Sequence, residues 1–415
     1  MPITIELSAK QADSIVRAEG RVNIWEGSVR SGKTIGSLYR WLQHIRHAPD
    51  GGQLIMAAKT LQTLHRNIIL PLQDPSQFGP VSREVHYTAG APQGVILGRP
   101  IHMIGANDQK AEEKIRGMTG AGAYVDEMTI IPQLFFNQLM SRQSVAGAKV
   151  FGSTNPDNPA HWLRKDFILA DNPWVRSFKF KIDDNPFLDP DFVAQQKSQY
   201  HGLYYRRFID GDWVMAEGAV YDMWDSNTDV VDILPAMRQW MCVAIDYGTS
   251  NPFHALILGL GIDGLLYIAG EWRYDGRTEM KQLTDSEYAD RVNAWLFSEP
   301  VRGHEVVIPQ YWVVDPSALS FRTELRQRGV TQIEAVNSVN DGIRLVSTLM
   351  GKHALKVHRS CEYLLDEIDG YSWDDRLAIL GEDRPIKLND HGVDALRYAV
   401  TTTQRLWRPH VRQAA

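Results

Sequence analysis

Short apolar runs alternate with longer polar stretches of helical character through the first half of the chain, which is the pattern of a parallel α/β sheet. The runs that predict strands are Val22–Trp25, Gln53–Ala58, Gly94–Leu97, Ile101–Gly105, Ala123–Val125 and Lys149–Gly152. Between Asn155 and Asp191, repeated Asn-Pro and Asp-Pro pairs disfavour helix and predict turns. A helix over Phe192–Ile209 follows, so residues 155–210 are expected to form a small lid or hinge within a domain of residues 1–210.

A polar, irregular segment at 211–235 predicts a linker, and the rhythm changes after it. The elements expected next are strands at Trp240–Asp246, Phe253–Leu260 and Leu265–Trp272, a helix at Ser286–Phe297, a strand at Tyr311–Val314, a helix at Ser320–Arg328, a strand at Gln332–Val336, two further helices and a last helix at Val393–Gln404. Asp263-Gly264 between the second and third strands is a hairpin signal. This order predicts a ribonuclease-H-like domain over 236–406, followed by a tail at 407–415.

Composition places the chain among soluble globular proteins, with 44% apolar and 23% charged residues. Its 415 residues suit two or three domains. No apolar run approaches the roughly 20 residues needed to cross a bilayer, and the charged first ten residues do not resemble a signal peptide. We therefore expect a cytoplasmic protein that contacts no membrane.

Charge and cysteine usage argue against two classes of protein, those that coat nucleic acid and those held together by disulfides or thiolate-bound zinc. The net charge of −6 does not predict a protein that coats nucleic acid, so any DNA contact must come from local clusters of Lys and Arg. The two cysteines, Cys242 and Cys361, have no CxxC spacing, which disfavours both a disulfide framework and a thiolate zinc site.

The strongest motif is the segment 27–34, which matches the phosphate-binding pattern GxxxxGK[ST] in full. Its residues are Gly27, Ser28, Val29, Arg30, Ser31, Gly32, Lys33 and Thr34. A predicted strand precedes it and a helix follows, so main-chain amides at the helix start would face the phosphates of ATP. Lys33 is expected to reach the β and γ phosphates and Thr34 to bind Mg²⁺. The alternative is a glycine-rich turn without a ligand.

Two acids, Asp126 and Glu127, directly follow a predicted strand and resemble a Walker B motif. Asp126 is expected to hold the Mg²⁺, and Glu127 to orient or deprotonate the attacking water. Ser153, Thr154 and Asn155 end the next strand, at the edge of an α/β sheet where ligands bind. There they are expected to sense the γ-phosphate and couple its loss to the domain; a capped turn is the alternative.

Hydrolysis also needs a cation on the transferring phosphoryl group. Arg30 within the loop and Arg116 in a glycine-rich segment before Asp126 are the candidate arginine fingers, and a surface salt bridge is the alternative for each. Gln11, upstream of the first strand, is a candidate for contacting adenine, or else a solvated helix residue.

A second set of acids lies in the other half. Asp246 and Asp315 each end a predicted strand, and Asp394 lies in the first turn of the last helix. Three converging carboxylates are costly unless cations neutralise them, so the set predicts one or two Mg²⁺ or Mn²⁺ ions. Two such ions would activate water and stabilise the leaving oxygen of a phosphodiester. His391 is expected to assist as a ligand or proton carrier.

Considered together, the two halves resemble the large terminase subunit of tailed double-stranded DNA bacteriophages. The segments that carry the resemblance are 27–34, Ile115–Gly117, Tyr124–Glu127, Ser153–Pro156, Ile245–Gly248, Val314–Asp315 and Asp390–Tyr398. The family packages DNA into a procapsid with energy from ATP, and its nuclease cuts concatemers into genome units. The resemblance implies an N-terminal P-loop (RecA/ASCE-like) ATPase domain and a C-terminal ribonuclease-H-like nuclease domain.

The same resemblance implies partners and roles. The partners are double-stranded DNA, a portal protein, a small terminase subunit and further copies of the chain in a ring, a pentamer by analogy, within the host cytoplasm. Arg116 matches the position of a finger that acts on a neighbouring subunit in some relatives. The middle nuclease acid varies in the family, so Asp263, Asp341 and Asp366 compete with Asp315, although their positions are typical of turns and helix surfaces.

Two other functions fit part of the pattern. A cellular DNA translocase or helicase with a nuclease would normally show a second RecA-like domain or helicase motifs, and the sequence shows neither. A scaffold in which nucleotide binding only drives assembly would not need Glu127 beside Asp126.

Overall fold

The computed structural model describes residues 6–107, 109–248, 251–298 and 307–411. The chain divides into two compact units. The first contains residues 1–197, 203–215 and 378–382, and the second contains residues 198–202, 216–377 and 383–415. Within the described ranges, no helix has the length and apolar character that crossing a membrane requires.

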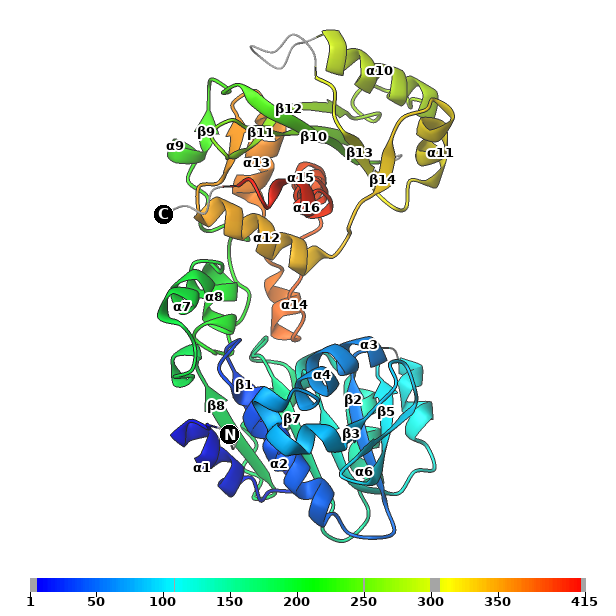
Figure 1. The fold of residues 1–415 in the computed structure, drawn as a ribbon. Coiled ribbons are helices and arrows are strands. Elements are labelled where there is room, and N and C mark those ends of the chain that lie inside the picture. The colour runs from blue at the N-terminus through cyan, green and yellow to red at the C-terminus, as the bar shows by residue number, and fades with distance from the viewer. Residues whose placement is uncertain (1–5, 108, 249–250, 299–306, 412–415) are drawn as a thin grey trace. The chain divides into compact units, whose positions relative to one another are not determined.

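The first unit is built on an eight-stranded sheet in the order β3-β4-β5-β2-β6-β7-β1-β8 (Figure 1). Its strands are β1 (Val22–Gly27), β2 (Gln53–Ala58), β3 (Val85–His86), β4 (Gln93–Ile96), β5 (Arg99–Gly105), β6 (Gly120–Val125), β7 (Lys149–Thr154) and β8 (Val175–Phe180). From β5 to β8 neighbouring strands pair in parallel, and β3 and β4 add an antiparallel edge.

Helices cover both faces of this sheet. Successive strand residues point to opposite sides, and both sides are apolar, so each face is buried against helices. Trp25 packs in one apolar cluster and Ile24 in the other. The helices are α1 (Ala9–Arg17), α2 (Lys33–His47), α3 (Leu61–Leu64), α4 (Leu70–Leu72), α5 (Pro75–Phe78), α6 (Gln133–Arg142), α7 (Pro190–Lys197) and α8 (Gly202–Phe208). Shorter turns are η1 (His65–Ile69), η2 (Gly79–Glu84), η3 (Gln109–Ile115), η4 (Met128–Ile130), η5 (Arg164–Ile168) and η6 (Ile182–Asp184).

The second unit is built on a seven-stranded sheet in the order β14-β13-β10-β11-β12-β15-β9. Its strands are β9 (Val230–Val231), β10 (Met237–Asp246), β11 (Phe253–Gly261), β12 (Leu266–Tyr274), β13 (Tyr311–Val314), β14 (Gln332–Glu334) and β15 (Leu355–His358). The strands β10, β11 and β12 are antiparallel, while β13 joins β10 in parallel and β15 joins β12 in parallel. The hairpin between β11 and β12 turns at Asp263-Gly264, as expected.

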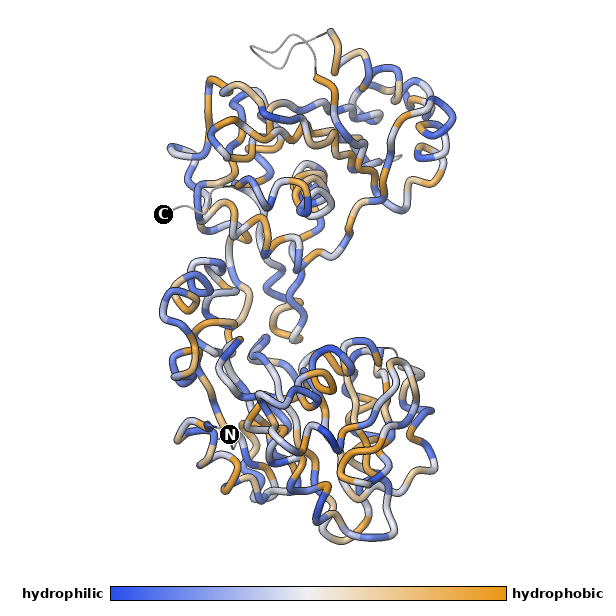
Figure 2. Tube along the Cα trace, viewed as in Figure 1, coloured by the Kyte–Doolittle hydropathy of each residue, from blue (hydrophilic) through white to orange (hydrophobic). Residues whose placement is uncertain are grey.

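The helices of the second unit are α9 (Ser226–Asp229), α10 (Asp285–Ser298), α11 (Leu319–Gln327), α12 (Val339–Gly351), α13 (Glu362–Gly370), α15 (His391–Thr402) and α16 (Gln404–Trp407). The short helix α14 (Asp375–Ile379) begins in the second unit, and its last two residues are assigned to the first. The helix α15 is almost entirely buried and packs on β10 and β11. Hydrophobic residues, orange in Figure 2, follow the strands of both sheets. The expected fold class, a P-loop α/β domain with a ribonuclease-H-like domain, is confirmed.

Several local expectations are wrong. The turn-rich stretch contains β8, which pairs with β1 along its whole length. The expected helix at 192–209 is two helices, α7 and α8. Part of the segment expected to be an irregular linker forms α9 and β9, and β9 pairs with β15, a strand that was not expected. The apolar pattern is weak in β8 and β15 because polar residues interrupt it, and β9 is too short, at two residues, to show one.

Candidate functional site

The loop 27–34 joins β1 to α2 and begins at a glycine that no other residue type can replace. Gly27 has φ +134°, and a Cβ atom there would lie 1.8 Å from the main-chain oxygen of Phe180. The amide of Ser28 donates to the same oxygen at 2.9 Å. Gly32, with φ +82°, is the residue before the first turn of α2. The start of the loop is therefore held against β8, and its end leads into the first turn of α2, where free main-chain amides can bind phosphate.

Inside the loop, the ammonium group of Lys33 is buried and bound from two sides. It donates to the main-chain oxygen of Ser28 at 2.9 Å and to Oδ1 of Asn155 at 2.7 Å. The amide nitrogen of Asn155 lies 3.3 and 3.2 Å from the two carboxylate oxygens of Glu127. One side chain thus joins the lysine to the glutamate. Burial lowers the pKa of Lys33, and Glu127 and Asp126 offset part of that shift.

The carboxylate of Asp126 lies beside this chain of contacts and is 4% exposed. It accepts from Ser153 at 3.2 Å and from the side-chain amide of Asn67 at 3.3 Å. Burial, followed by the charge of Glu127, raises the pKa of Asp126 well above its ordinary value. A buried carboxylate next to a second one needs a cation, and Mg²⁺ prefers such oxygen ligands.

A cavity of about 640 Å³ brings most of the predicted residues together. Residues 29–34, Asp126, Glu127 and Asn155 line it, and so do Arg66, Asn67 and Asn185, which the sequence analysis did not single out. Asn67 and Arg66 lie on the π-helical turn η1, a distortion that is common at functional sites. Such a turn leaves no signature in the spacing of residues. Asn185 donates to the main-chain oxygen of Arg30 at 2.8 Å.

The remaining candidates of the first unit are Arg30, Arg116 and Gln11, and only Arg30 lines the cavity. Arg30 lines the cavity with φ +57°. Arg116 is 59% exposed, pairs with Glu112 at 2.5 Å and does not line this cavity. Gln11 is only 4% exposed, so its interpretation as a solvated helix residue is wrong. Its side chain donates to the main-chain oxygen of Gly32 at 2.9 Å and so helps to hold the end of the loop in place.

In the second unit, the strand order places two acids side by side. β10 and β13 are parallel with Ile245 opposite Val314, so Asp246 and Asp315 follow at the same edge of the sheet. The amide of Asp315 donates to the main-chain oxygen of Ile245 at 3.3 Å. Its carboxylate accepts from the hydroxyl of Tyr398 on α15 at 3.0 Å.

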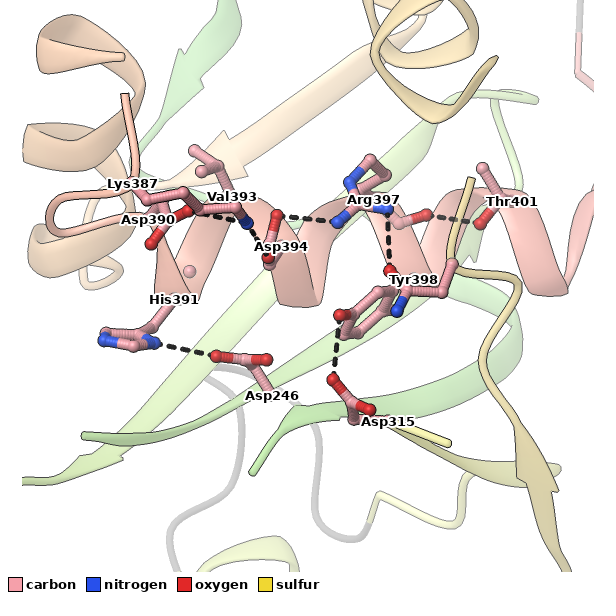
Figure 3. A network of polar contacts seen from close by, with 12 residues as sticks. Asp246, Asp315, Lys387, Asp390, His391, Val393, Asp394, Arg397, Tyr398 and Thr401 are labelled. Atoms are coloured by element: carbon pink, nitrogen blue, oxygen red, sulfur yellow. Dashed lines mark hydrogen bonds and ion pairs between the residues drawn. The ribbon is translucent and has the colours of Figure 1, made fainter. Parts of the chain in front are cut away.

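The third acid, Asp394, lies in the first turn of α15. Asp390 precedes this helix, and His391, its first residue, donates from Nδ1 to Oδ2 of Asp246 at 2.8 Å. Figure 3 shows Asp246 and Asp315 beside the face of α15 that carries Asp394 and Tyr398. Asp246, His391 and Asp394 line one cavity of about 440 Å³, whereas Asp315 does not line it.

Cationic side chains hold Asp394 from two directions. Lys387 lies 3.2 Å from its carboxylate and 3.0 Å from Asp390, and Arg397 lies 2.7 Å from its other oxygen. Neither contact was predicted from the sequence. Lys387 precedes the helix in an irregular segment, and Arg397 was included only as part of the segment Asp390–Tyr398. In the part of the chain that the structure describes, no three or more His, Cys, Asp or Glu side chains are grouped so as to hold a metal ion.

The raised pKa of Asp246 indicates that the charge of this carboxylate is only partly compensated. Burial raises the pKa of Asp246, His391 opposes the shift, and Asp394 and Asp315 add to it. The hydrogen bond to Asp246 raises the pKa of His391. Repulsion among the acids therefore persists beside the existing ion pairs, and the oxygen donors fit Mg²⁺ or Mn²⁺ in kind.

Buried polar residues hold the start of α15 in place. Oε2 of Glu367 accepts from the amides of Gly392 at 2.5 Å and Val393 at 3.1 Å. His254, fully buried, lies 3.8 Å from Glu367 and 3.0 Å from Glu271. These residues were missed because no motif links them. The competing acids behave as expected: Asp263 caps the hairpin turn, Asp341 pairs with Arg344, and Asp366 is exposed on α13.

Comparison with known proteins points to one family. Residues 24–227 match the family model described as "Terminase large subunit, T4likevirus-type, N-terminal". The large terminase of the thermophilic bacteriophage D6E in complex with ADP is 33% identical with a TM-score of 0.81, and the match covers 95% of this chain and 99% of that one. The same protein in complex with ATP-gamma-S is 32% identical with a TM-score of 0.80, over 95% and 98% of the two chains.

A match to a curated protein is more distant. The large terminase subunit of Escherichia phage T5 is 24% identical over 249 residues, which are 56% of this chain and 52% of that protein. The chain therefore spans about half the length of the curated relative it matches.

Proposed function

Because the chain belongs to the phage large terminase family, we propose that it is a genome-packaging motor, in which the first unit hydrolyses ATP to move double-stranded DNA into a procapsid and the second unit cuts concatemeric DNA into genome units. Family membership sets aside the cellular translocase. The contact that carries the ATPase part is Asn155 between Lys33 and Glu127, since it links the phosphate-binding lysine to the residue that faces the attacking water.

In the ATPase site, each residue has a role that its position supports. Loop amides and Lys33 bind the phosphates, and Thr34 and Asp126 hold Mg²⁺. Glu127 positions the attacking water, and Asn155 transmits the loss of the γ-phosphate from Lys33 to β7. Arg30 and Arg116 remain the two candidates for the arginine finger. The position of Arg30 in the cavity supports a role within its own chain, and the exposure of Arg116 supports a role on a neighbouring copy in a ring. The D6E protein forms complexes with ADP and ATP-gamma-S, which supports an adenine nucleotide as the ligand of this chain.

The nuclease site is supported by the carboxylates at the edge of the second sheet. Asp246, Asp315 and Asp394 would hold one or two Mg²⁺ or Mn²⁺ ions, and Asp394 would give up part of its present contacts with Lys387 and Arg397. When bound, such ions supply activated water and stabilise the leaving oxygen. His391 holds Asp246 in position and is placed to carry a proton. DNA, a portal protein and a small terminase subunit are the partners that this function needs.

The ATPase is tested with Glu127→Gln, which keeps the size of the side chain and removes its basicity. ATP turnover by the full chain with double-stranded DNA should fall at least about 10²-fold, while binding of a fluorescent ATP analogue is retained. Glu84→Gln, at an exposed position in the same unit, should leave turnover unchanged. Equal turnover in Glu127→Gln and the unaltered chain would remove the motor and leave a nucleotide-dependent scaffold.

The nuclease is tested with Asp246→Ala, assayed on plasmid DNA with Mn²⁺. Cleavage should be abolished and ATP turnover should stay intact, because the two sites lie in different units. Asp366→Ala, which removes an exposed acid of α13, should cleave normally. Cleavage that survives in Asp246→Ala would show that the acidic site is misassigned.

A further inference from the structure

A row of three directly opposite residues crosses the centre of the second sheet. Asp246 of β10 lies opposite His254 of β11, and His254 lies opposite Arg273 of β12. Residues directly opposite in neighbouring strands project from the same face of a sheet. With strands about 4.8 Å apart, Arg273 lies about 10 Å from Asp246 on that face. Both residues line the same cavity of about 440 Å³.

Arg273 differs from Lys387, another cation that lines this cavity, because its guanidinium makes no hydrogen bond within the described residues. Its Nε is buried without a hydrogen bond, and its side chain is 20% exposed. The nearest carboxylate oxygen, Oδ2 of Asp275, is 3.9 Å from Nη2, beyond hydrogen-bond distance. Lys387, by contrast, already binds two carboxylates.

A guanidinium group with unused donors in a mostly buried position indicates a missing anionic partner. Arginine carries five N–H donors, and leaving them unmatched away from water is costly. The ring of Tyr363 supports the group, with Cζ of Arg273 4.5 Å from the ring centroid. This contact supplies no hydrogen-bond acceptor to the guanidinium. Nε is buried, so the Nη groups, which make no hydrogen bond to any residue that the structure describes, are the donors available to a ligand in the cavity.

The geometry points to Arg273 as an anchor for a DNA phosphodiester, one that neighbours the phosphodiester cut beside Asp246. This inference rests on the proposed nuclease function and deepens it. Carboxylates dominate the Asp246 end of the cavity, so an approaching DNA backbone is repelled there unless a cation holds it nearby. The planar guanidinium suits the paired oxygens of a phosphate, and a site about 10 Å away leaves room for the adjoining nucleotide.

The test compares cleavage kinetics of the full chain with those of Arg273→Gln and Arg273→Lys. Arg273→Gln should raise KM for DNA about tenfold or more, with kcat changed less than about threefold, and Arg273→Lys should recover part of the loss. In a metal-free anisotropy assay, Arg273→Gln should lower the salt dependence of DNA binding by about one phosphate contact. Arg326→Gln, at an exposed position on α11, is the matched control.

The outcomes separate this inference from the function beneath it. Unchanged KM and salt dependence in Arg273→Gln, in a protein whose Asp246→Ala form no longer cuts, would overturn the anchor alone. A fall in kcat with weaker Mn²⁺ binding would also overturn it, because Arg273 would then act through the metal site. If the unaltered chain does not cut DNA, the nuclease proposal fails and the anchor with it.

Free phosphate has the same chemistry as the DNA backbone, so one arm of the experiment addresses it. Inorganic phosphate is titrated against DNA binding in the metal-free assay. Competition that weakens in Arg273→Gln, together with a raised KM for DNA, supports the DNA backbone as ligand. Competition that weakens in Arg273→Gln while KM and salt dependence for DNA are unchanged would assign the residue to free phosphate and overturn the proposal. Unchanged circular dichroism and thermal unfolding establish that each variant is folded.

Discussion

Nδ1 of His391 lies 2.8 Å from Oδ2 of Asp246, although 145 positions separate the two residues in the chain. The bond joins the end of β10 to the first residue of α15. It therefore ties the helix that carries Asp394 to the strand that carries Asp246. A partner of this kind orients a metal-binding carboxylate and restricts its rotation.

We expect His391→Asn to lower DNA cleavage or Mn²⁺ affinity about 10- to 100-fold, because it removes the ring that orients Asp246. Cleavage rates at several Mn²⁺ concentrations would show which of the two changes. ATP turnover should not change. His410→Asn, at an exposed position of the same unit, is the control. Unaltered cleavage at limiting Mn²⁺ would contradict the orienting role.

Asn155→Ala should slow ATP hydrolysis about 10- to 100-fold, since hydrogen bonds to charged groups contribute about 1.5–3 kcal/mol. The substitution breaks the contact with Lys33 and the contact with Glu127 together. Steady-state turnover and nucleotide affinity are the measurements, and affinity should change less than turnover. Asn227→Ala, on the exposed helix α9, serves as the control. Turnover equal to that of the control variant would show that the bridge has no part in hydrolysis.

Gly27→Ala should destabilise the first unit more than Gly90→Ala. Both glycines have positive φ, which costs an alanine about 1–2 kcal/mol. A Cβ atom at Gly90 meets nothing within 4 Å, whereas at Gly27 it meets a main-chain oxygen that cannot move aside. Urea unfolding should show about 1–3 kcal/mol of additional loss for Gly27→Ala. Equal losses would mean that β8 yields at this point.

The buried imidazole of His44 predicts a pH dependence for the first unit. Burial lowers the pKa of His44 below 6.5, although the bond to the oxygen of Ala121 opposes the shift. Below pH 6.5 the unfolded chain then binds more protons than the folded one. The stability that neutral His44 provides is therefore present above pH 6.5 and lost as pH falls through its lowered pKa.

Urea unfolding followed by tryptophan fluorescence at pH 7.5 and pH 5.5 measures this effect. The free energy of unfolding should fall less between the two pH values in His44→Gln, which keeps a donor for Ala121 but does not titrate. His47→Gln, at an exposed position of the same helix, should behave like the unaltered chain. An identical fall in all three proteins would exclude His44 as the source.

Most of the fold could be predicted because its elements and motifs are marked by residues that adjoin in the sequence. The bounds of β2 and β13 agree with their apolar runs, and the P-loop and the Asp-Glu pair are read directly because their residues adjoin. The strand β15 was missed because its Lys356 is polar, yet buried, and compensated by Asp229 at 2.8 Å. A partner 127 positions away is invisible to a local pattern.

The candidate sites follow the same division. Asp246 and Asp394 were found because each ends or begins an element. Lys387 and Arg273 were missed because only their surroundings distinguish them. Lys387 binds two carboxylates, whereas the guanidinium of Arg273 makes no hydrogen bond in the described ranges of the chain. Such relationships arise only when strands and helices pack, so residue types and spacing do not encode them in any short segment.

The two outermost strands of the second sheet have a consequence for association between copies of the chain. β14 has three residues and β9 has two, so each border of the sheet offers very few unpaired amide and carbonyl groups. Long open borders invite another molecule to add its own strand, and short ones deny it a template. Copies of the chain therefore have little tendency to aggregate through the borders of this sheet.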